Sequence, residues 1–409
     1  MEQMVSSKLE KELQILVVDD STSYRRLLSR HLQNWGGYKV IEAEDGTQAL
    51  DMIINQNISM VISDWEMPGL NGPELCQAMR DAALDHYVYF ILVTSRGSTE
   101  DIIVGMEAGA DDFLTKPIDQ QELRVRLRAG ERILKLEEQL EEKNQRLNEA
   151  YKLIEADLKA AADMQQSLLP QSDIEIDNVD CKWFFQPSLF VSGDMHSYFK
   201  LDHDHMGFYS VDVSGHGVKP AMLSVTLSRF LSHGSTNGLL KKIDSTGTSY
   251  VITPPSVVVS QLNAQFQMTR QDSTYFTIVY GVLNIRTGQG QMTRAGHPHP
   301  IIVHQDGQIE VITDGGLPVG FIENPDYTNC QFQLLTGSRL YLYTDGITEC
   351  EDTDEQLFGE ERLLHLLCEL RSMSLNHALN ALQTDLLAWR DPKKTAFNDD
   401  ISMLAIGFN

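Results

Sequence analysis

The 409-residue sequence has little positive charge and no long apolar run. Its 33 Lys and Arg are outnumbered by 58 Asp and Glu, which gives a formal net charge of −25. This balance argues against a general nucleic-acid binder, because phosphate backbones attract basic surfaces. No apolar run is long enough to cross a membrane, and the N-terminal string MEQMVSSKLEKEL lacks the apolar core of a signal peptide. We therefore expect a cytoplasmic protein with no nucleic-acid or membrane partner.

Cysteine is also scarce, with five scattered residues and no CxxC pair. A disulfide framework or a structural zinc site is therefore not expected, and a reducing compartment fits this pattern. The chain is nonetheless too long for a single hydrophobic core, so we expect two domains and a connector. The predicted parts are an N-terminal extension at 1–13, a first domain at 14–130, a helical linker at 131–172 and a second domain at 173–409.

The first domain alternates short apolar runs with amphipathic segments. The apolar runs lie at 15–20, 38–43, 60–64, 89–95 and 112–117. Strands that alternate with helices predict a doubly wound, five-stranded parallel sheet, an α/β fold whose ligand site lies at the carboxyl ends of the strands. Those ends carry a set of polar residues, namely Asp19, Asp20, Asp64, Thr94 and Lys116. Carboxylates gathered at one edge of a sheet would hold a divalent cation.

The strings VVDD, SDWEMPG, VTS and TKP, in this order and spacing, resemble the receiver domain of bacterial two-component response regulators. The resemblance implies that Asp64 accepts a phosphoryl group from a histidine kinase or a phosphotransfer protein. Lys116 would then pair with the phosphoryl oxygens, and Thr94 would hydrogen-bond to them. The acidic pocket for a magnesium ion would consist of Asp19, Asp20, Asp64 and, through its backbone carbonyl, Glu66.

The connector at 120–168 contains no proline and a single glycine, and it is rich in Leu, Glu, Lys, Arg and Gln. Such a run predicts one long helix. A strict seven-residue step relates Ile133, Leu140, Leu147, Ile154, Ala161 and Leu168. This seam favours a parallel two-stranded coiled coil, and hence a homodimer, whose polar companion positions imply modest stability. The alternative is a solvated single helix stabilised by Glu–Lys pairs.

From about residue 174 the pattern changes to alternating strands separated by turn signals such as TGQG and QDGQ. These signals favour antiparallel sheets. Helical segments are expected at 219–232, 255–269 and 360–390. Because strands and helices form separate classes here, the sequence predicts an α+β sandwich.

The strings VSGDMHSYF, DVSGHG, AGHPHP, YTDGITE and DDISMLAIG resemble the SpoIIE-like branch of the metal-dependent PPM (type 2C) protein serine/threonine phosphatases. The resemblance implies two Mn²⁺ or Mg²⁺ ions bridged by Asp212, which activate water without a protein nucleophile. Asp194 would serve the second metal, and Asp345 and Asp399 the first. The full set of expected ligands is Asp194, Asp212, the backbone carbonyl of Val213, Asp345 and Asp399, with Asp400 as the alternative to its neighbour.

Some polar residues near these motifs carry weaker expectations. Many family members read GGDxxD where this chain reads SGDMHS, so Ser197 stands at the second acidic position. A hydroxyl is a weaker metal ligand than a carboxylate, and an extra cation there would be held loosely. His216 is expected to support the metal site, whereas His297 and His299 are expected to organise a loop.

Together these features predict a response regulator whose output is a protein phosphatase. Phosphorylation of Asp64 would change the dimer through the linker, whose end at 161–170 resembles the switch helix of SpoIIE-type phosphatases. By resemblance, the substrate would be a phosphorylated STAS-domain anti-sigma factor antagonist, and its dephosphorylation would regulate a sigma factor by partner switching. The alternative is a scaffold that binds its partner with little or no turnover. Activation and repression by the receiver are both compatible with the sequence.

Overall fold

The computed structural model describes residues 12–95, 99–170, 176–232, 239–243, 250–269, 273–394 and 396–409. The predicted extension at 1–13 therefore lies almost wholly outside the described residues. The chain divides into two compact units, Met1–Tyr151 and Lys152–Asn409, and the division falls within the long helix α5 (Gln120–Gln166). None of the described helices is both long and apolar enough to cross a lipid bilayer.

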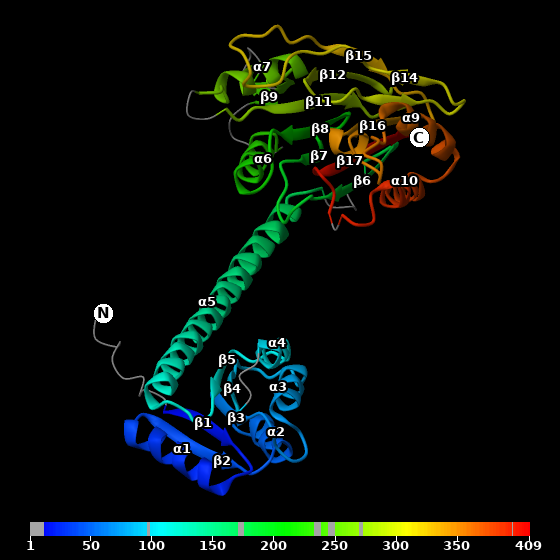
Figure 1. Cartoon of the computed structure of the whole chain (residues 1–409). Helices are drawn as coiled ribbons and strands as arrows, with labels where there is room; N and C mark the ends of the chain where they lie inside the picture. The colour runs from blue at the N-terminus through cyan, green and yellow to red at the C-terminus, as the bar shows by residue number, and fades with distance from the viewer. Residues whose placement is uncertain are drawn as a thin grey trace. The chain divides into compact units, whose positions relative to one another are not determined.

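The first unit contains the predicted five-stranded parallel sheet (Figure 1). Its strands are β1 (Leu13–Val18), β2 (Tyr38–Ala43), β3 (Met60–Asp64), β4 (Tyr89–Thr94) and β5 (Asp112–Thr115), in the spatial order β2-β1-β3-β4-β5. The strands alternate with α1 (Thr22–Trp35), α2 (Gly46–Asn55), α3 (Gly72–Asp81) and α4 (Thr99–Glu107). The order reverses between β1 and β3, and the carboxyl ends of strands at such a reversal border the ligand crevice of a doubly wound fold.

Both faces of this sheet are buried, which explains the continuous apolar runs in the sequence. All six residues of β4 are buried. Phe90 and Leu92 join the cluster on one face, and Tyr89 and Ile91 join the cluster on the other. The core of the first unit is thus divided by its sheet into two layers.

Helix α5 confirms the predicted long helix and has 47 residues. Its first turns belong to the first unit, because Leu123 and Leu127 are buried in the core. A Cβ on Gly130 would lie 2.6 Å from Cδ1 of Tyr89, so a glycine is needed where the helix crosses the sheet. The start of the helix is therefore anchored to the first unit by close packing.

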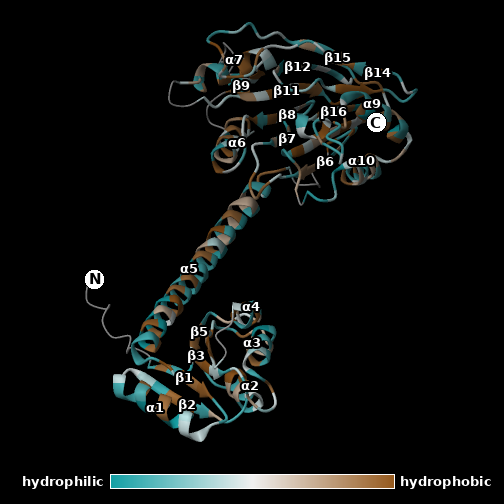
Figure 2. Cartoon of the chain, in the orientation of Figure 1, coloured by the Kyte–Doolittle hydropathy of each residue, from teal (hydrophilic) through white to brown (hydrophobic). Residues whose placement is uncertain are grey.

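The middle of α5 exposes its apolar residues, and Figure 2 shows hydrophilic and hydrophobic residues mixed along it. Leu140, Leu147 and Ile154 are 53%, 68% and 58% exposed. These residues belong to the seven-residue seam. A seam exposed in a single chain agrees with the expected coiled coil, which stays a prediction.

The second unit is built from two five-stranded sheets. The first has the order β15-β12-β11-β8-β7 and contains β7 (Met195–Lys200), β8 (His205–Val213), β11 (Phe276–Asn284), β12 (Gln289–Ala295) and β15 (Cys330–Gln333). The second has the order β14-β13-β16-β17-β6 and contains β6 (Val179–Gln186), β13 (Ile301–Val303), β14 (Ile309–Val311), β16 (Arg339–Tyr343) and β17 (Ile401–Phe408). The paired strands in both sheets are antiparallel. Apart from these sheets, β9 (Lys241–Ile243) pairs antiparallel with β10 (Tyr250–Ile252).

Helices cover the outer faces of the two sheets and confirm the α+β sandwich (Figure 1). Helices α6 (Val218–Phe230) and α7 (Pro255–Gln265) pack on the first sheet, and α9 (Glu360–Glu369) and α10 (Leu375–Trp389) pack on the second. The inner faces meet through side chains such as Phe208, Val279, Leu342 and Leu404.

The predicted helical segment at 360–390 is interrupted in the structure. A 3-10 turn at Leu370–Ser372 follows α9, and α10 then begins after Ser374. The hydroxyl of Ser374 accepts a hydrogen bond from the backbone N–H of His377, which caps the new helix.

Candidate functional sites

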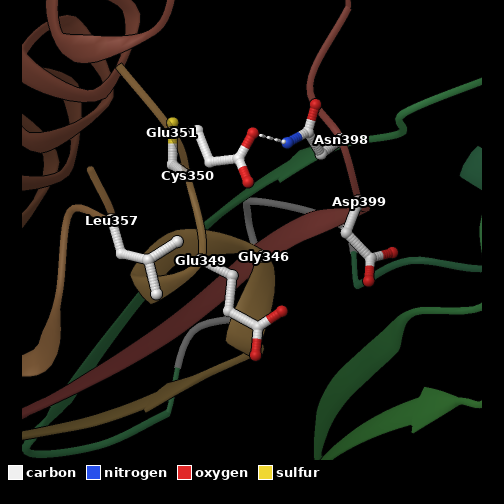
Figure 3. A pocket seen from close by; sticks show the side chains of 7 residues that line it. All are labelled: Gly346, Glu349, Cys350, Glu351, Leu357, Asn398 and Asp399. Carbon is white, nitrogen blue, oxygen red and sulfur yellow. Dashed lines mark hydrogen bonds between the residues drawn. The ribbon is translucent and has the colours of Figure 1, made fainter. Parts of the chain in front are cut away.

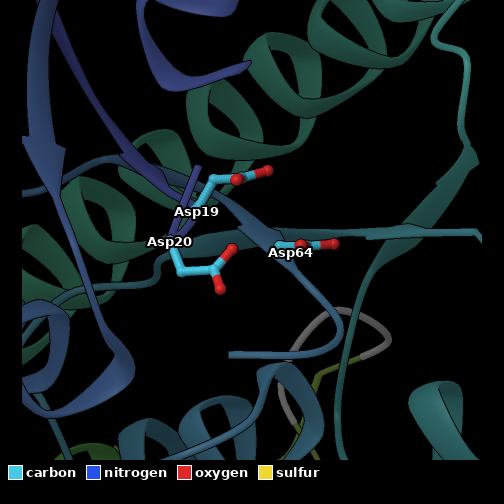
Figure 4. A group of neighbouring side chains, drawn as sticks. All are labelled: Asp19, Asp20 and Asp64. Atoms are coloured by element: carbon cyan, nitrogen blue, oxygen red, sulfur yellow. The ribbon is translucent and has the colours of Figure 1, made fainter. Parts of the chain in front are cut away.

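Three carboxylates meet at the carboxyl edge of the parallel sheet (Figure 4). Asp19 and Asp20 follow β1, and Asp64 ends the neighbouring strand β3. One oxygen of each lies within 4.8 Å of the other two. Among the described residues, no other three Asp, Glu, His or Cys side chains are grouped so closely. Three close carboxylate oxygens fit a hard divalent cation such as Mg²⁺.

Lys116 lies against the same carboxylates. Its Nζ is 2.9 Å from Oδ2 of Asp19 and 2.8 Å from Oδ2 of Asp64. Burial lowers the pKa of Lys116, but the two carboxylates outweigh burial and the net shift is upward. Burial also raises the pKa of Asp64, although Lys116 and the backbone N–H of Trp65 act against this rise. The lysine is therefore a fixed cation beside the predicted phosphoacceptor.

The other predicted residues of this site lie at the same edge. Thr94 is buried at the end of β4, and its neighbour Val93 is the register partner of Asp64. Glu66 follows Asp64 by two residues and is exposed. All five side chains predicted at the strand ends thus come from adjoining strand ends of one sheet, and their individual roles stay predictions.

A second group of carboxylates comes from both sheets of the second unit. Asp194 precedes β7, and Asp212 lies at the end of β8. Asp345 follows β16 and begins the short helix α8 (Asp345–Thr348), while Asp399 and Asp400 precede β17. The tertiary structure therefore gathers residues that the sequence separates by up to about two hundred positions.

Burial shifts the pKa values of this group upward. Asp194 is 2% exposed, and burial together with the nearby Asp212 raises its pKa well above the usual range. Burial raises the pKa of Asp212 to about 8, with repulsion from Asp345 and Asp399 adding to the shift. The pKa values of Asp345 and Asp399 are also raised, mainly by burial. Buried like charges are unfavourable unless they are protonated or paired with cations, so this donor set fits metal ions.

The spacing of this group differs from that of Asp19, Asp20 and Asp64. No three of these described side chains offer oxygens that all lie within 4.8 Å of one another. In this arrangement the side chains do not enclose one small cation, so Asp212, Asp345 and Asp399 would have to move closer together to share one.

Asp400 differs from Asp399 in its contacts. Its Oδ1 accepts hydrogen bonds from the backbone N–H of Ser188 at 2.7 Å and from the Ser188 hydroxyl at 2.9 Å. Its Oδ2 accepts from the backbone N–H of Gly193 at 2.8 Å. The buried carboxylate thus ties β17 to the segment before β7. This arrangement supports the prediction that Asp399, rather than Asp400, faces a metal.

Two glycines allow these strand ends to approach each other. A Cβ on Gly346 would lie 2.0 Å from the backbone oxygen of Asp400, and a Cβ on Gly193 would lie 2.8 Å from that of Val213. The glycines of the strings YTDG and SGDM are therefore required by packing rather than by a turn.

A pocket of about 400 Å³ opens beside Asp399 (Figure 3). Its lining consists of Gly346, Glu349, Cys350, Glu351, Leu357, Asn398 and Asp399. The carboxylates of Glu349 and Asp399 lie on one side, and Glu351, which accepts a hydrogen bond from Asn398 at 2.7 Å, lies on the other. Sequence reasoning did not predict Glu349. Its position one helical turn after Asp345 is the signal that could have identified it.

Ser197 occupies the position where an acidic residue was expected. It lies on β7 opposite Tyr209 of β8, and its side chain hydrogen-bonds to that tyrosine. A pair of hydroxyls therefore stands where the resemblance predicts a carboxylate.

The last turn of α5 is bonded to the segment that leads to Asp194. Gln165 is 3% exposed; its Oε1 accepts from the backbone N–H of Ser192 at 3.0 Å. Its Nε2 donates to the Ser192 carbonyl at 2.7 Å and to the Ser224 hydroxyl at 3.0 Å. The Ser192 hydroxyl in turn accepts from the backbone N–H of Asp194 at 3.0 Å. One residue thus separates the linker helix from a predicted metal ligand.

Comparisons with known proteins match both parts of the chain. The family model described as Stage II sporulation protein E (SpoIIE) matches residues 202–409, about half of the chain, and the response regulator receiver domain model matches residues 15–128. The chain therefore belongs to the SpoIIE family and joins a receiver domain to a PP2C-type phosphatase domain.

Individual relatives resemble one part of the chain each. Response regulator MprA of Mycobacterium sp. (strain KMS) is 41% identical over 117 residues, which are 29% of this chain and 50% of the relative. The protein of the same name from Mycobacterium avium (strain 104) is 40% identical over 129 residues, 32% of this chain and 55% of the relative. The chain thus spans about half the length of the curated relatives it matches. The solved SiaA-PP2C domain of Pseudomonas aeruginosa, 20% identical with a TM-score of 0.53, covers 64% of this chain and 99% of its own, and shows the PP2C fold.

Proposed function

We propose that this protein is a response regulator whose output domain is a metal-dependent protein serine/threonine phosphatase. The observation that carries the proposal is the carboxylate group at the meeting edge of the two sheets, made of the buried Asp194, the partly buried Asp212 and Asp345, and the exposed Asp399, all with raised pKa values. Two Mn²⁺ or Mg²⁺ ions, when bound there, would supply an activated water and offset the charge of the phosphoryl oxygens.

Each aspartate of this group has a proposed role in holding the two cations. Asp212 would be shared between the cations, Asp345 and Asp399 would hold one of them, and Asp194 the other, with the carbonyl of Val213 as a further ligand. The pocket beside Asp399 offers space for a phosphorylated side chain. The thiol of Cys350 lines the same pocket, but burial raises its pKa, so it is a poor nucleophile. Direct attack by water on the phosphoryl group agrees better with this environment.

In the receiver, Asp64 would accept a phosphoryl group from a histidine kinase or a phosphotransfer protein, with Mg²⁺ held by the acidic pocket. Lys116 would stabilise the transferred group electrostatically, because it lies 2.8 Å from Oδ2 of Asp64. The signal would then pass through the linker of a homodimer to Gln165 and the metal site. The exposed seam of α5 and the buried end of that helix support this route.

The substrate would be a phosphoserine or phosphothreonine on a STAS-domain anti-sigma factor antagonist, so that turnover regulates a sigma factor by partner switching. Membership in the SpoIIE family supports this choice. The rival function is a scaffold that binds the same partner with little or no turnover.

Hydrolysis of a small aryl phosphate and of a phosphorylated STAS protein by the full chain, with and without Mn²⁺, tests the proposal. Asp345→Ala should reduce Mn²⁺-dependent turnover by more than about 100-fold, because loss of partners that merely orient ligands already costs 10–100-fold. Asp385→Ala, which removes an exposed carboxylate on α10, is the matched control. Turnover that persists in Asp345→Ala would refute the site, and binding without turnover by the wild type would favour the scaffold.

A further inference from the structure

His297 lies buried between strands that carry metal carboxylates of different sheets. It follows β12 by two residues and is 1% exposed. The preceding Gly296 has a φ of +70°, and a Cβ there would lie 2.5 Å from Cγ of Pro318. The Nη1 group of Arg294 donates to the His297 carbonyl at 2.9 Å. The backbone around this histidine is therefore held in one conformation, which directs the ring between the sheets.

On one side, His297 contacts the strand that pairs with Asp212. Its Nδ1 is 2.8 Å from Oγ1 of Thr277. Thr277 is the register partner of Asp212 in the ladder between β11 and β8. The imidazole is thus one residue away from the carboxylate that the two cations would share.

On the other side, His297 faces the strand that leads to Asp345. Burial lowers the pKa of His297 to about 3, and the backbone carbonyl of Tyr343 opposes this shift. Tyr343 ends β16 and stands two residues before Asp345. Within the described part of the chain, Nε2 has no hydrogen-bond partner, and the Tyr343 carbonyl is the backbone acceptor that acts on the ring.

The two ring nitrogens of His297 have different neighbours. Burial favours a neutral imidazole, in which one nitrogen donates and the other accepts. With the proton on Nε2, the ring presents its donor to the carbonyl of Tyr343 and Nδ1 accepts from the Thr277 hydroxyl, whose oxygen also lies 3.5 Å from the carbonyl oxygen of Asp212. A neutral His297 can therefore contact both sheets at once.

We propose that His297 is a positioning residue that ties the Asp212 strand to the Asp345 strand and sets the separation of these two carboxylates. The inference rests on the proposed phosphatase function and adds a residue to it. Because β8 and β16 belong to different sheets, side-chain contacts must keep their ends in register. Thr344 provides a comparable tie, since its Oγ1 donates to Oδ2 of Asp194 at 2.7 Å.

Two variants remove the connection, one at His297 and one at Thr277. His297→Asn keeps a nitrogen near the position of Nδ1 but loses the reach toward Tyr343, and Thr277→Val removes the hydroxyl while keeping its shape. His299→Asn, at a neighbouring side chain that is 39% exposed, is the control. The readouts on the full chain are the Mn²⁺ concentration for half-maximal hydrolysis of an aryl phosphate, kcat at saturating Mn²⁺, and Tm.

Each variant should raise the Mn²⁺ requirement by about tenfold or more, because groups that orient metal ligands contribute 10–100-fold to affinity. The value of kcat at saturating Mn²⁺ should change much less, and the double variant should be no worse than the stronger single variant, since both interrupt one connection. The control should behave as the wild type.

A lower Tm with an unchanged Mn²⁺ requirement in Thr277→Val would overturn the inference, because the tie would then be structural only. If the wild type shows no Mn²⁺-dependent hydrolysis, the proposed function fails, and Mn²⁺ binding measured by calorimetry decides the inference separately. Weaker Mn²⁺ binding in both variants would support it, and wild-type affinity in both would overturn it.

Discussion

Asp399 and Asp400 are adjacent in the sequence, yet their contacts predict opposite consequences when each is replaced by Asn. The carboxylate of Asp400 accepts three hydrogen bonds from Ser188 and Gly193 in a buried environment. An Asn side chain can offer its oxygen to Ser188, but it then turns its NH₂ group toward the N–H of Gly193. One hydrogen bond to a charged group is lost, worth roughly 1.5–3 kcal/mol, and two donors face each other. We therefore expect Asp400→Asn to reduce the free energy of unfolding of the second unit by about 3 kcal/mol.

Asp399→Asn should act in the opposite way. Burial raises the pKa of Asp399, and the nearby Asp345 and Asp400 raise it further, so its charge is unfavourable in the metal-free protein. Removal of this charge should leave the metal-free stability unchanged or increase it. Turnover should nevertheless fall by more than about 100-fold, because a direct metal ligand is lost.

Scanning calorimetry of the full chain in a metal chelator, together with Mn²⁺-dependent hydrolysis, separates the two roles. A loss of about 3 kcal/mol corresponds to a decrease in Tm of roughly 6–12 °C for a unit of this size. Unchanged Tm with abolished turnover in Asp400→Asn would refute the reasoning and make Asp400 a ligand. Normal turnover in Asp399→Asn would refute it equally.

Three further perturbations follow from single features of the structure. Because the pKa of Asp212 is raised to about 8, the metal-free folded state retains a proton that the unfolded chain releases near pH 4. The stability of the metal-free protein, measured by calorimetry in chelator, should therefore decrease as the pH rises from about 4 to 8, and saturating Mn²⁺ should abolish this slope. A flat profile in chelator would contradict the prediction. Gln165→Leu removes three hydrogen bonds and should bring the ratio of turnover with and without a beryllofluoride phosphoryl mimic close to one. The control Gln166→Leu, at an exposed residue, should keep the wild-type ratio. Equal ratios in the two variants would reject coupling between the receiver and the metal site through Gln165. Leu147 lies on the seam and is 68% exposed, so Leu147→Lys should convert a dimer to a monomer in sedimentation. Leu153 is 65% exposed but lies outside the seam, so Leu153→Lys should leave the dimer intact. A monomeric wild type would reject the coiled coil.

The architecture of both units could be predicted because the signals for it are local. Strands β2 and β3 have the bounds expected from their apolar runs, since a parallel strand buried on both faces leaves a continuous run. The long helix was recognisable from its composition. The interruption between α9 and α10 was not, because neither Gly nor Pro marks it and a serine cap resembles any other serine.

The candidate sites were predicted less completely than the fold. Aspartates at strand ends were visible in the sequence, but the pairing of Asp400 with Ser188 spans 212 positions. His297 was missed as part of the site for the same reason, because the residues that face it are supplied by other strands. Glu349 was missed although its spacing of four residues from Asp345 is a local signal.

The sequence by itself determined which chemical groups this protein places at its strand ends: oxygen donors for hard cations, a lysine beside one set of them, and glycines that let the strands approach. Those features depend on residue type and on short-range periodicity. Only the tertiary structure decided which of two neighbouring carboxylates is held by backbone donors, that Gln165 touches the segment before Asp194, and that His297 lies between two sheets. Such choices depend on the packing of one sheet against another, which brings together residues whose separation in the chain carries no local signal.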